Sequence, residues 1–430
     1  MVPSNHSSSN PIMTSAEIDR LPLKQIEAAL HKTTEALAAE LVAPSETTPD
    51  WTELEWCMAR AVAAMHGVSP LLSSTLRWRG PESWESFLQE QRQHTLERHQ
   101  RIARLLADIG ARAVRDDIAI VPLKGAALHD IGIYRPGERP MSDIDLLVRS
   151  TNMQATARLL NDCGYHESCV TWKHWVFEPE TKADLGGFGE HALNPIKIEL
   201  HTRVVERMPV VDRDISAMIF PPLPSAGLNS YPSISALMVH LLTHAAGCMC
   251  FSSIRLLHLH DIASLARRMT SSDWEAIFKV ANNRAPWWVS PPLMLTAHYY
   301  PSAIPAPIVA RAASDCSWLL RQICRRRTLS DVSLSNLWIQ AFPGIEWSHS
   351  AREIFNHVMS RVNPDREVLV GRKETLKMHP SSARFSWPYM SQWQRMVRWV
   401  FRRPPRVETL ACVCAALAQL NTQSQLTQHS

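Results

Sequence analysis

Apolar residues recur at helical spacings through the first quarter of the chain. One helical pattern covers residues 16–45, and a second covers 51–66, with Asp50 as its expected N-cap. Helical character continues from 71 to 78. Residues 82–115 predict one long helix, because the positions compatible with a core recur at spacings of three, four and seven: Phe87, Gln91, Thr95, Ile102, Leu105, Leu106 and Ile109.

The pattern then alternates between short strand-like runs and short helices, which predicts a small mixed sheet. The predicted order is a strand at 118–123, a helix at 126–133, a strand at 142–148, a helix at 152–163 that Gly164 stops, and extended segments at 171–178 and 195–205. From Ser233 onward the pattern is helical again, with helices predicted at 233–250, 254–268 and 273–283.

These patterns predict an α+β fold in which a small mixed β-sheet core is flanked by N-terminal helices and a C-terminal helical lobe. The predicted domain plan is a disordered N-terminus at 1–15, an N-terminal helical region at 16–115, the core at 116–230, a C-terminal helical region at 231–420 and a disordered tail at 421–430. A chain of 430 residues is long enough for two or more lobes.

Composition describes an ordinary globular protein, with 45% hydrophobic and 20% charged residues. The net charge of +4 permits an anionic ligand but does not demand nucleic acid. The nine cysteines show no C-x-x-C spacing, and their odd number argues against a disulfide framework. The N-terminus has no signal-peptide core, and the longest apolar stretches, 236–250 and 410–420, are too short to span a membrane, so we expect a soluble cytoplasmic protein.

The strand at 142–148 carries two acids on one face. Side chains at i and i+2 of a strand point the same way, so Asp143 and Asp145 lie side by side while Ile144 and Leu146 face the opposite side. Paired carboxylates repel each other unless a cation lies between them, and hard divalent ions prefer oxygen ligands. The strand before them ends in Lys124-Gly125 and runs into a helix start, where free backbone N–H groups favour a phosphate.

A later segment repeats this alternation. Lys197, Glu199 and His201 share one face, because they alternate with Ile196, Ile198 and Leu200. An acid and an imidazole beside two aspartates favour a functional site. The alternative is a surface glutamate paired with Lys197.

Together these segments resemble the polymerase-β-type nucleotidyltransferase superfamily, and within it most closely the bacterial uncharacterised nucleotidyltransferase family. The resemblance covers roughly residues 55–300 and rests on the following residues: Leu123-Lys124-Gly125-Ala126-Ala127-Leu128, Arg139, Asp143-Ile144-Asp145-Leu146-Leu147-Val148, Leu159-Leu160 with Gly164-Tyr165, and Ile198-Glu199-Leu200-His201. Two positions depart from the pattern. Ala126 replaces the superfamily's small hydroxyl residue, and Glu199 stands where the third carboxylate is usually aspartate.

The resemblance implies a metal-dependent enzyme that moves a nucleoside monophosphate from a nucleoside triphosphate, with ATP the expected donor, to an acceptor hydroxyl. Asp143, Asp145 and Glu199 would hold Mg²⁺ or Mn²⁺. The backbone N–H groups of the Gly125-Ala126 turn would bind phosphate.

Two further roles are left open by the same resemblance. Lys124 or Arg139 would offset the charge of the leaving pyrophosphate. His201 would act as a general base or orient Glu199.

The sequence leaves both the activity and the acceptor open. The departures at Ala126 and Glu199 also fit a catalytically idle relative that binds a nucleotide or a protein partner as a regulator. The acceptor can be a small molecule, a protein or an RNA. His240 and His244, four residues apart, are interpreted as hydrogen-bonded histidines of a helical bundle rather than as metal ligands. The Trp- and Arg-rich segment 387–403 is interpreted as a helix with inward tryptophans rather than a membrane or nucleic-acid patch.

Overall fold

The structure is a computed structural model, and it describes residues 22–180, 188–208, 212–279, 286–340, 342–364, 391, 393–395, 397 and 404–427. The predicted disordered N-terminus at 1–15 lies outside these residues, as do most of the segment 387–403 and the last three residues of the predicted tail. None of the described helices has the length and apolar run that a bilayer crossing requires.

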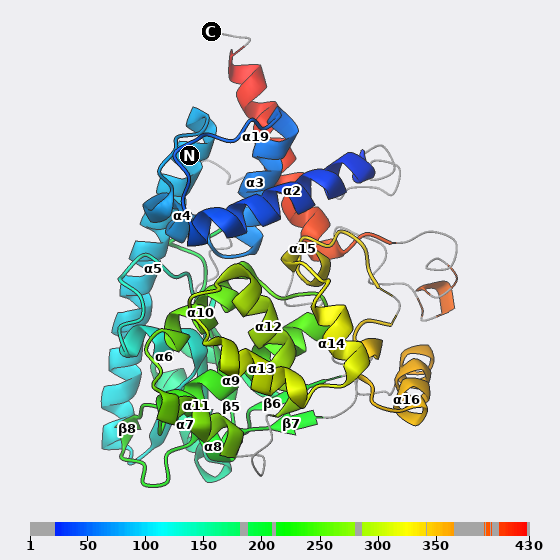
Figure 1. The fold of residues 1–430 in the computed structure, drawn as a ribbon. Helices are drawn as coiled ribbons and strands as arrows, with labels where there is room; N and C mark the ends of the chain where they lie inside the picture. Colours follow the sequence, from blue (N-terminus) through cyan, green and yellow to red (C-terminus); the bar gives the residue numbers. More distant parts are fainter. Residues whose placement is uncertain are drawn as a thin grey trace, which may run out of the picture.

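Among the described residues, four helices precede the first strand. They are α2 (Leu23–Val42), α3 (Glu53–Met65), α4 (Ser69–Thr75) and α5 (Glu82–Arg115). The helix α5 confirms the predicted long helix and runs along one side of the molecule (Figure 1). Acids in its first turn and arginines in its last turn complement the helix dipole, which favours a helix of this length.

The N-cap of α3 differs from the sequence prediction. Thr52, not Asp50, caps the helix: its hydroxyl accepts the Glu55 N–H at 3.3 Å, and the Glu55 carboxylate accepts the Thr52 N–H at 2.8 Å. Trp51 is buried immediately before the cap. The capping box starts the helix at Glu53, two residues later than a cap at Asp50 would place it.

Six strands form the main sheet, in the order β3-β4-β5-β2-β1-β8. Their bounds are β1 (Ala119–Pro122), β2 (Asp143–Val148), β3 (Tyr165–Val170), β4 (His174–Pro179), β5 (Lys197–His201) and β8 (Gly227–Leu228). The pairs β2–β5 and β1–β8 are parallel, and the other pairs are antiparallel. A separate hairpin joins β6 (Val205–Arg207) to β7 (Asp212–Asp214). The predicted mixed sheet and the α+β fold class are therefore confirmed.

The two faces of the sheet pack against different helices. Ile120, Ile144 and Ile198 belong to a core shared with the second half of α5 and with α7 (Met153–Asp162), which a short 3₁₀ turn η1 (Ser150–Asn152) precedes. Val121 and Leu147 face the other way, into the larger core that includes α6 (Lys124–Asp130) and the C-terminal helices. Asp143 and Asp145 alternate with Ile144 and Leu146, so the two carboxylates lie on this second face.

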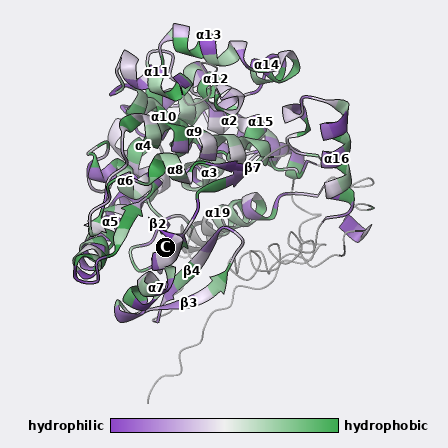
Figure 2. Ribbon diagram, turned by 90° about the horizontal axis from the view of Figure 1, so that it is seen from below, coloured by the Kyte–Doolittle hydropathy of each residue, from purple (hydrophilic) through white to green (hydrophobic). Residues whose placement is uncertain are grey.

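Helices fill the rest of the described chain, as the sequence predicts. Their bounds are α8 (Ser216–Ile219), α9 (Ile234–Cys250), α10 (Leu256–Ala266), α11 (Ser271–Lys279), η2 (Trp287–Val289), α12 (Ser290–Tyr299), α13 (Ala306–Ser314), α14 (Trp318–Cys324), α15 (Leu329–Val332), η3 (Ile345–Trp347), α16 (Ala351–Val362) and α19 (Val407–Thr427). Figure 2 shows α9 and α10 in the midst of the other helices, with α16 standing apart. The helix α19 continues to Thr427, within the segment for which the sequence predicts a disordered tail.

Both ends of the described chain meet at α3. The helices α2 and α19 pack against it, and they lie together at one end of the molecule (Figure 1). A buried hydrogen-bond chain joins the same regions: Ser335 Oγ lies 2.6 Å from Thr34 Oγ1 and 2.9 Å from His66 Nε2. His66 Nδ1 accepts the Leu256 N–H at 2.8 Å, and burial lowers the pKa of His66 to about 3, so the imidazole stays neutral.

A buried ion pair attaches α10 to the loop between β1 and β2. Arg139 donates through Nε and Nη2 to the two oxygens of Asp261, at 2.9 and 2.8 Å, and both residues are buried. Tyr134 donates a third hydrogen bond to Asp261 at 2.7 Å. Bidentate pairing with an added hydroxyl satisfies the carboxylate fully, which is what a charge in an apolar interior requires.

We predict that Asp261→Ala lowers the free energy of unfolding by about 3–5 kcal/mol, because it leaves the Arg139 guanidinium buried and unpaired. Denaturant unfolding followed by circular dichroism measures this loss. Glu46→Ala is the control, since it removes an exposed ion pair with Arg77 and should leave the unfolding midpoint unchanged. Equal midpoints for all three proteins would show that the buried pair does not stabilise the fold.

Candidate active site

The register of β2 and β5 brings the three predicted acids together. In this parallel pair Asp145 is the partner of Glu199, and Asp143 is the partner of Lys197. Residues paired in register on neighbouring strands point to the same face, so the carboxylates of Asp143, Asp145 and Glu199 share the face that looks toward α9. The geometry proposed from the sequence alternation is thus present, and the aspartates do not turn into the apolar core on the other face.

Asp145 is the buried member of the group and is fully partnered. Lys124 Nζ lies 3.2 Å from its Oδ2, and His201 Nε2 lies 3.0 Å from its Oδ1. Burial alone would raise the pKa of Asp145, but the Lys124 charge and the His201 hydrogen bond outweigh it and hold that pKa well below its usual range. Asp145 is therefore ionised at neutral pH.

Asp143 lies two residues away from Asp145, and its pKa is shifted in the opposite direction. Burial, together with the nearby charges of Asp145 and Glu199, raises the pKa of Asp143 to about 6. Among the described residues no ion pair reaches it, and its one hydrogen bond is a long contact of 3.5 Å with Ser142 Oγ. One carboxylate of the pair is thus neutralised by the protein, and the other is left without a cation.

Two histidines surround Glu199. Its Oε2 lies 3.6 Å from His201 Nε2 and 3.4 Å from Nδ1 of His174, which β4 contributes. His174 Nδ1 is buried and makes no hydrogen bond. Burial lowers the pKa of His174 to about 4, so its ring is neutral. His174 carries no signal in the sequence, because only the antiparallel pairing of β4 with β5 places it opposite His201.

Two backbone amides of the Lys124-Gly125-Ala126 turn are engaged within the protein, and phosphate binding by the turn stays a prediction. Lys124 adopts the left-handed region at φ +47°, and its N–H donates to the Tyr231 hydroxyl at 3.3 Å. The Ala126 N–H donates to the Leu123 carbonyl at 3.2 Å. Both amides are thus already engaged, and the side chain of Lys124 is the part of this turn that reaches the acids.

The position of Arg139 explains why residue 125 is a glycine. A Cβ on residue 125 would overlap the Arg139 guanidinium and lie 3.1 Å from Met141 Cγ, so only glycine leaves room for the buried arginine. Arg139 donates to Asp261 and does not point at the carboxylates. This pairing makes Lys124 the better candidate for offsetting pyrophosphate charge, a role that stays a prediction for Arg139. Its partner lies 122 residues further along the chain, where the sequence offers no signal of the pairing.

Among the described residues, His174, Glu199 and His201 form the group around Glu199 whose ligand atoms all lie within 4.8 Å of one another, and the two aspartates share the same face of the sheet. Three carboxylates from two adjacent strands supply oxygen ligands, and the Lys124 ammonium occupies the position where a cation would balance them. The Asp143 carboxylate forms no ion pair among the described residues, and His174 Nδ1, which lies 3.4 Å from Glu199 Oε2, makes no hydrogen bond. Ligation of Mg²⁺ or Mn²⁺ by Asp143, Asp145 and Glu199 stays a prediction.

Comparison with known proteins gives one match. A protein-family model described as "Uncharacterised nucleotidyltransferase" matches residues 52–299, which run from the N-cap of α3 to the last residue of α12. The matched segment is more than half of the chain and contains every strand of the main sheet and of the hairpin. No curated protein and no solved structure matched the chain.

The two aspartates should respond in opposite ways to neutralisation. The pKa of Asp143 is higher in the folded protein than in the unfolded chain, so the folded state binds this proton more tightly. The resulting stabilisation is complete below about pH 4 and is lost as the pH rises through about 6. We predict that Asp143→Asn stabilises the metal-free protein at pH 7.5 by about 1–2 kcal/mol, a value discounted for partial exposure, and has little effect at pH 4.

Asp145→Asn is the matched control. The folded-state pKa of Asp145 is lowered, so its contribution is present at neutral pH, and the variant should be destabilised there because Lys124 loses its partner. Thermal unfolding in the presence of a chelator, at several pH values, measures both effects. A destabilised Asp143→Asn protein at pH 7.5 would contradict the proposed crowding of carboxylates.

Proposed function

Because the chain belongs to the family of uncharacterised nucleotidyltransferases, we propose that it transfers a nucleoside monophosphate from a nucleoside triphosphate to an acceptor hydroxyl in a metal-dependent reaction. The observation that carries this proposal is the register of β2 with β5, which gathers Asp143, Asp145 and Glu199 on one face. In the reaction the acceptor oxygen forms a bond to the α-phosphorus, and the bond to the pyrophosphate oxygen breaks.

Mg²⁺ or Mn²⁺ held by the three carboxylates would neutralise the triphosphate and polarise the bond to the leaving group. The remaining contributions come from the protein itself. Asp145 is ionised in advance, because Lys124 and His201 keep its pKa low. The site therefore needs no proton release from this residue before it takes up a cation.

Lys124 is our candidate for the phosphate-binding cation. Burial lowers its pKa, but Asp145 and Glu199 outweigh burial and raise it, so the ammonium remains charged. With a cation bound at Asp145, the flexible Lys124 side chain would be free to contact the phosphates. Arg255, exposed at the N-cap of α10, acts electrostatically on Asp143 and is the second basic residue that borders the acids.

His201 is proposed as a positioning residue. Its Nε2 lies between Asp145 and Glu199, at 3.0 and 3.6 Å, and its side chain is buried. Burial would lower the pKa of His201, but its hydrogen bonds to the two acids raise it. An imidazole held between two carboxylates orients them, whereas a general base would need a free nitrogen directed at the acceptor.

We predict that Asp143→Ala/Asp145→Ala abolishes calorimetric binding of ATP in the presence of Mg²⁺ and reduces transfer by at least about 100-fold, since both cation ligands are lost. Asp162→Ala is the matched control. It removes an exposed carboxylate at the end of α7, on the other side of the sheet, and should bind and react like the wild type. Equal binding by the wild type and the double variant would overturn the proposed site.

The second candidate function is a catalytically idle nucleotide-binding regulator. It is favoured by one observation: the Ala126 N–H is bonded within the protein and the residue has no hydroxyl, so this position offers nothing to a phosphate. Incubation with α-labelled triphosphates and with small-molecule, protein and RNA acceptors distinguishes the two functions. Label transfer with release of pyrophosphate supports the enzyme, and binding without either supports the regulator.

A further inference from the structure

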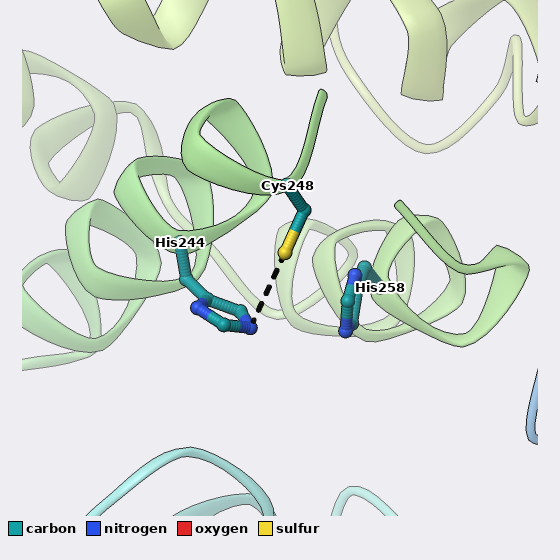
Figure 3. Close-up of side chains that lie close together, drawn as sticks. All are labelled: His244, Cys248 and His258. Atoms are coloured by element: carbon teal, nitrogen blue, oxygen red, sulfur yellow. Dashed lines mark hydrogen bonds between the residues drawn. The ribbon is translucent and has the colours of Figure 1, made fainter. Parts of the chain in front are cut away.

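A second group of side chains with metal-binding chemistry lies on α9 and α10. His244 and Cys248 are four residues apart on α9 and therefore on one face, and His258 lies in the first turn of α10. The three side chains converge on a common space (Figure 3), and one candidate ligand atom from each lies within 4.8 Å of the other two. All three are partly exposed, so an ion can reach them.

The spacing of the first two atoms fits tetrahedral coordination. His244 Nε2 lies 3.7 Å from Cys248 Sγ. Zinc–nitrogen and zinc–sulfur bonds of about 2.05 and 2.3 Å, at a tetrahedral angle, place the two ligand atoms about 3.6 Å apart. The two atoms, which share a proton in the structure, thus already have the separation that they would have as ligands of one tetrahedral metal ion.

A carboxylate already orients the first histidine. His244 Nδ1 lies 3.0 Å from Glu206 Oε1, and the other oxygen of Glu206 accepts from Lys173 Nζ at 2.8 Å. The hydrogen bond keeps a proton on Nδ1, so Nε2 is the nitrogen available to a metal ion once the proton that it shares with Cys248 is displaced. Metal-binding histidines characteristically donate their second N–H to a carboxylate in this way.

His258 can bind a metal ion with the loss of only one weak hydrogen bond. Its Nδ1 accepts a long hydrogen bond of 3.3 Å from the Arg255 N–H, and Nε2 has no partner among the described residues. Ligation through either nitrogen would replace this bond, because binding at Nε2 requires the ring proton on Nδ1. One weak hydrogen bond is therefore exchanged for a metal–nitrogen bond.

We propose that His244, Cys248 and His258 form a binding site for a borderline-soft divalent cation of the Zn²⁺ type, with a fourth position open to water or a substrate atom. Two imidazoles and a thiolate favour such an ion over Mg²⁺, which prefers oxygen. Three protein ligands with an open position are characteristic of a catalytic rather than a closed structural zinc site. The inference goes beyond the proposed nucleotidyl transfer and does not depend on it.

The site lies within electrostatic reach of the carboxylates on β2 and β5. The charge of Lys124 acts on both His244 and His258, and that of Arg255 acts on both Cys248 and Asp143. A cation at the second site would thus add positive charge near the position assigned to the triphosphate.

Titration with Co²⁺ after chelation and reduction tests the proposal. Tetrahedral Co²⁺ shows visible absorption, and a thiolate ligand adds a charge-transfer band in the near ultraviolet. We expect one Co²⁺ per chain with both features, and displacement of Co²⁺ by one Zn²⁺. Cys248→Ser should abolish the charge-transfer band, His258→Gln should weaken Zn²⁺ binding, and Glu206→Gln should weaken it by about 10–100-fold.

Two controls separate this site from other thiols and from the acid cluster. Cys163→Ser, which alters a partly exposed cysteine after α7, should retain the charge-transfer band. Asp143→Asn/Asp145→Asn should retain Zn²⁺ binding even where nucleotide binding is lost, so failure of one proposal is distinguishable from failure of the other. Circular dichroism verifies that each variant is folded.

Three results would overturn the proposal. They are the absence of a charge-transfer band in the wild type, retention of the band in folded Cys248→Ser, and rapid alkylation of Cys248 by iodoacetamide that Zn²⁺ does not slow. The last would instead identify a reactive thiolate that His244 activates and Glu206 orients, since the charge of His244 outweighs burial and lowers the pKa of Cys248.

Discussion

The bidentate pair between Arg139 and Asp261 is the constraint on which the arrangement of both candidate sites depends. It fixes α10 to the loop between β1 and β2, and so sets where α10 presents His258 and Arg255. It also dictates the glycine at position 125, because the guanidinium fills the space of a side chain there. Arg139, which the sequence suggests as a phosphate ligand, thus holds two parts of the fold together through its ion pair with Asp261.

Charge balance decides the chemistry of the acid cluster. Three carboxylates crowd one face of the sheet, and a single ammonium with one imidazole compensates them unevenly. The folded chain therefore holds one acid that is ionised at any ordinary pH and one that is protonated in mild acid. A divalent cation would relieve this imbalance and so, under the proposed function, would couple its own binding to the stability of the core.

The sequence predicted what depends on local periodicity. Strand alternation identified the faces of Asp143 and Glu199, and helical spacing identified α5 to the residue. The sequence did not predict contacts between residues that lie far apart along the chain. Asp261 takes Arg139 away from the predicted site, His174 enters through the pairing of an edge hairpin, and Glu206 reaches His244 from a three-residue strand. Cys248 had a readable signal, a cysteine one helical turn after a histidine, although His244 was interpreted only as a bundle residue.

The hydroxyl of Ser335 has a consequence for the unit that folds. Ser335 and Thr34 both lie outside the segment 52–299 that the family model matches. Ser335 nevertheless bonds to the buried His66, and Thr34 bonds to Ser335. A protein trimmed to the shared segment would keep the imidazole and lose its acceptor, at a cost of about 1–3 kcal/mol for that nitrogen alone. The matched segment is therefore narrower than the unit that we expect to reach full stability, which also includes α2 and the residues that follow α15.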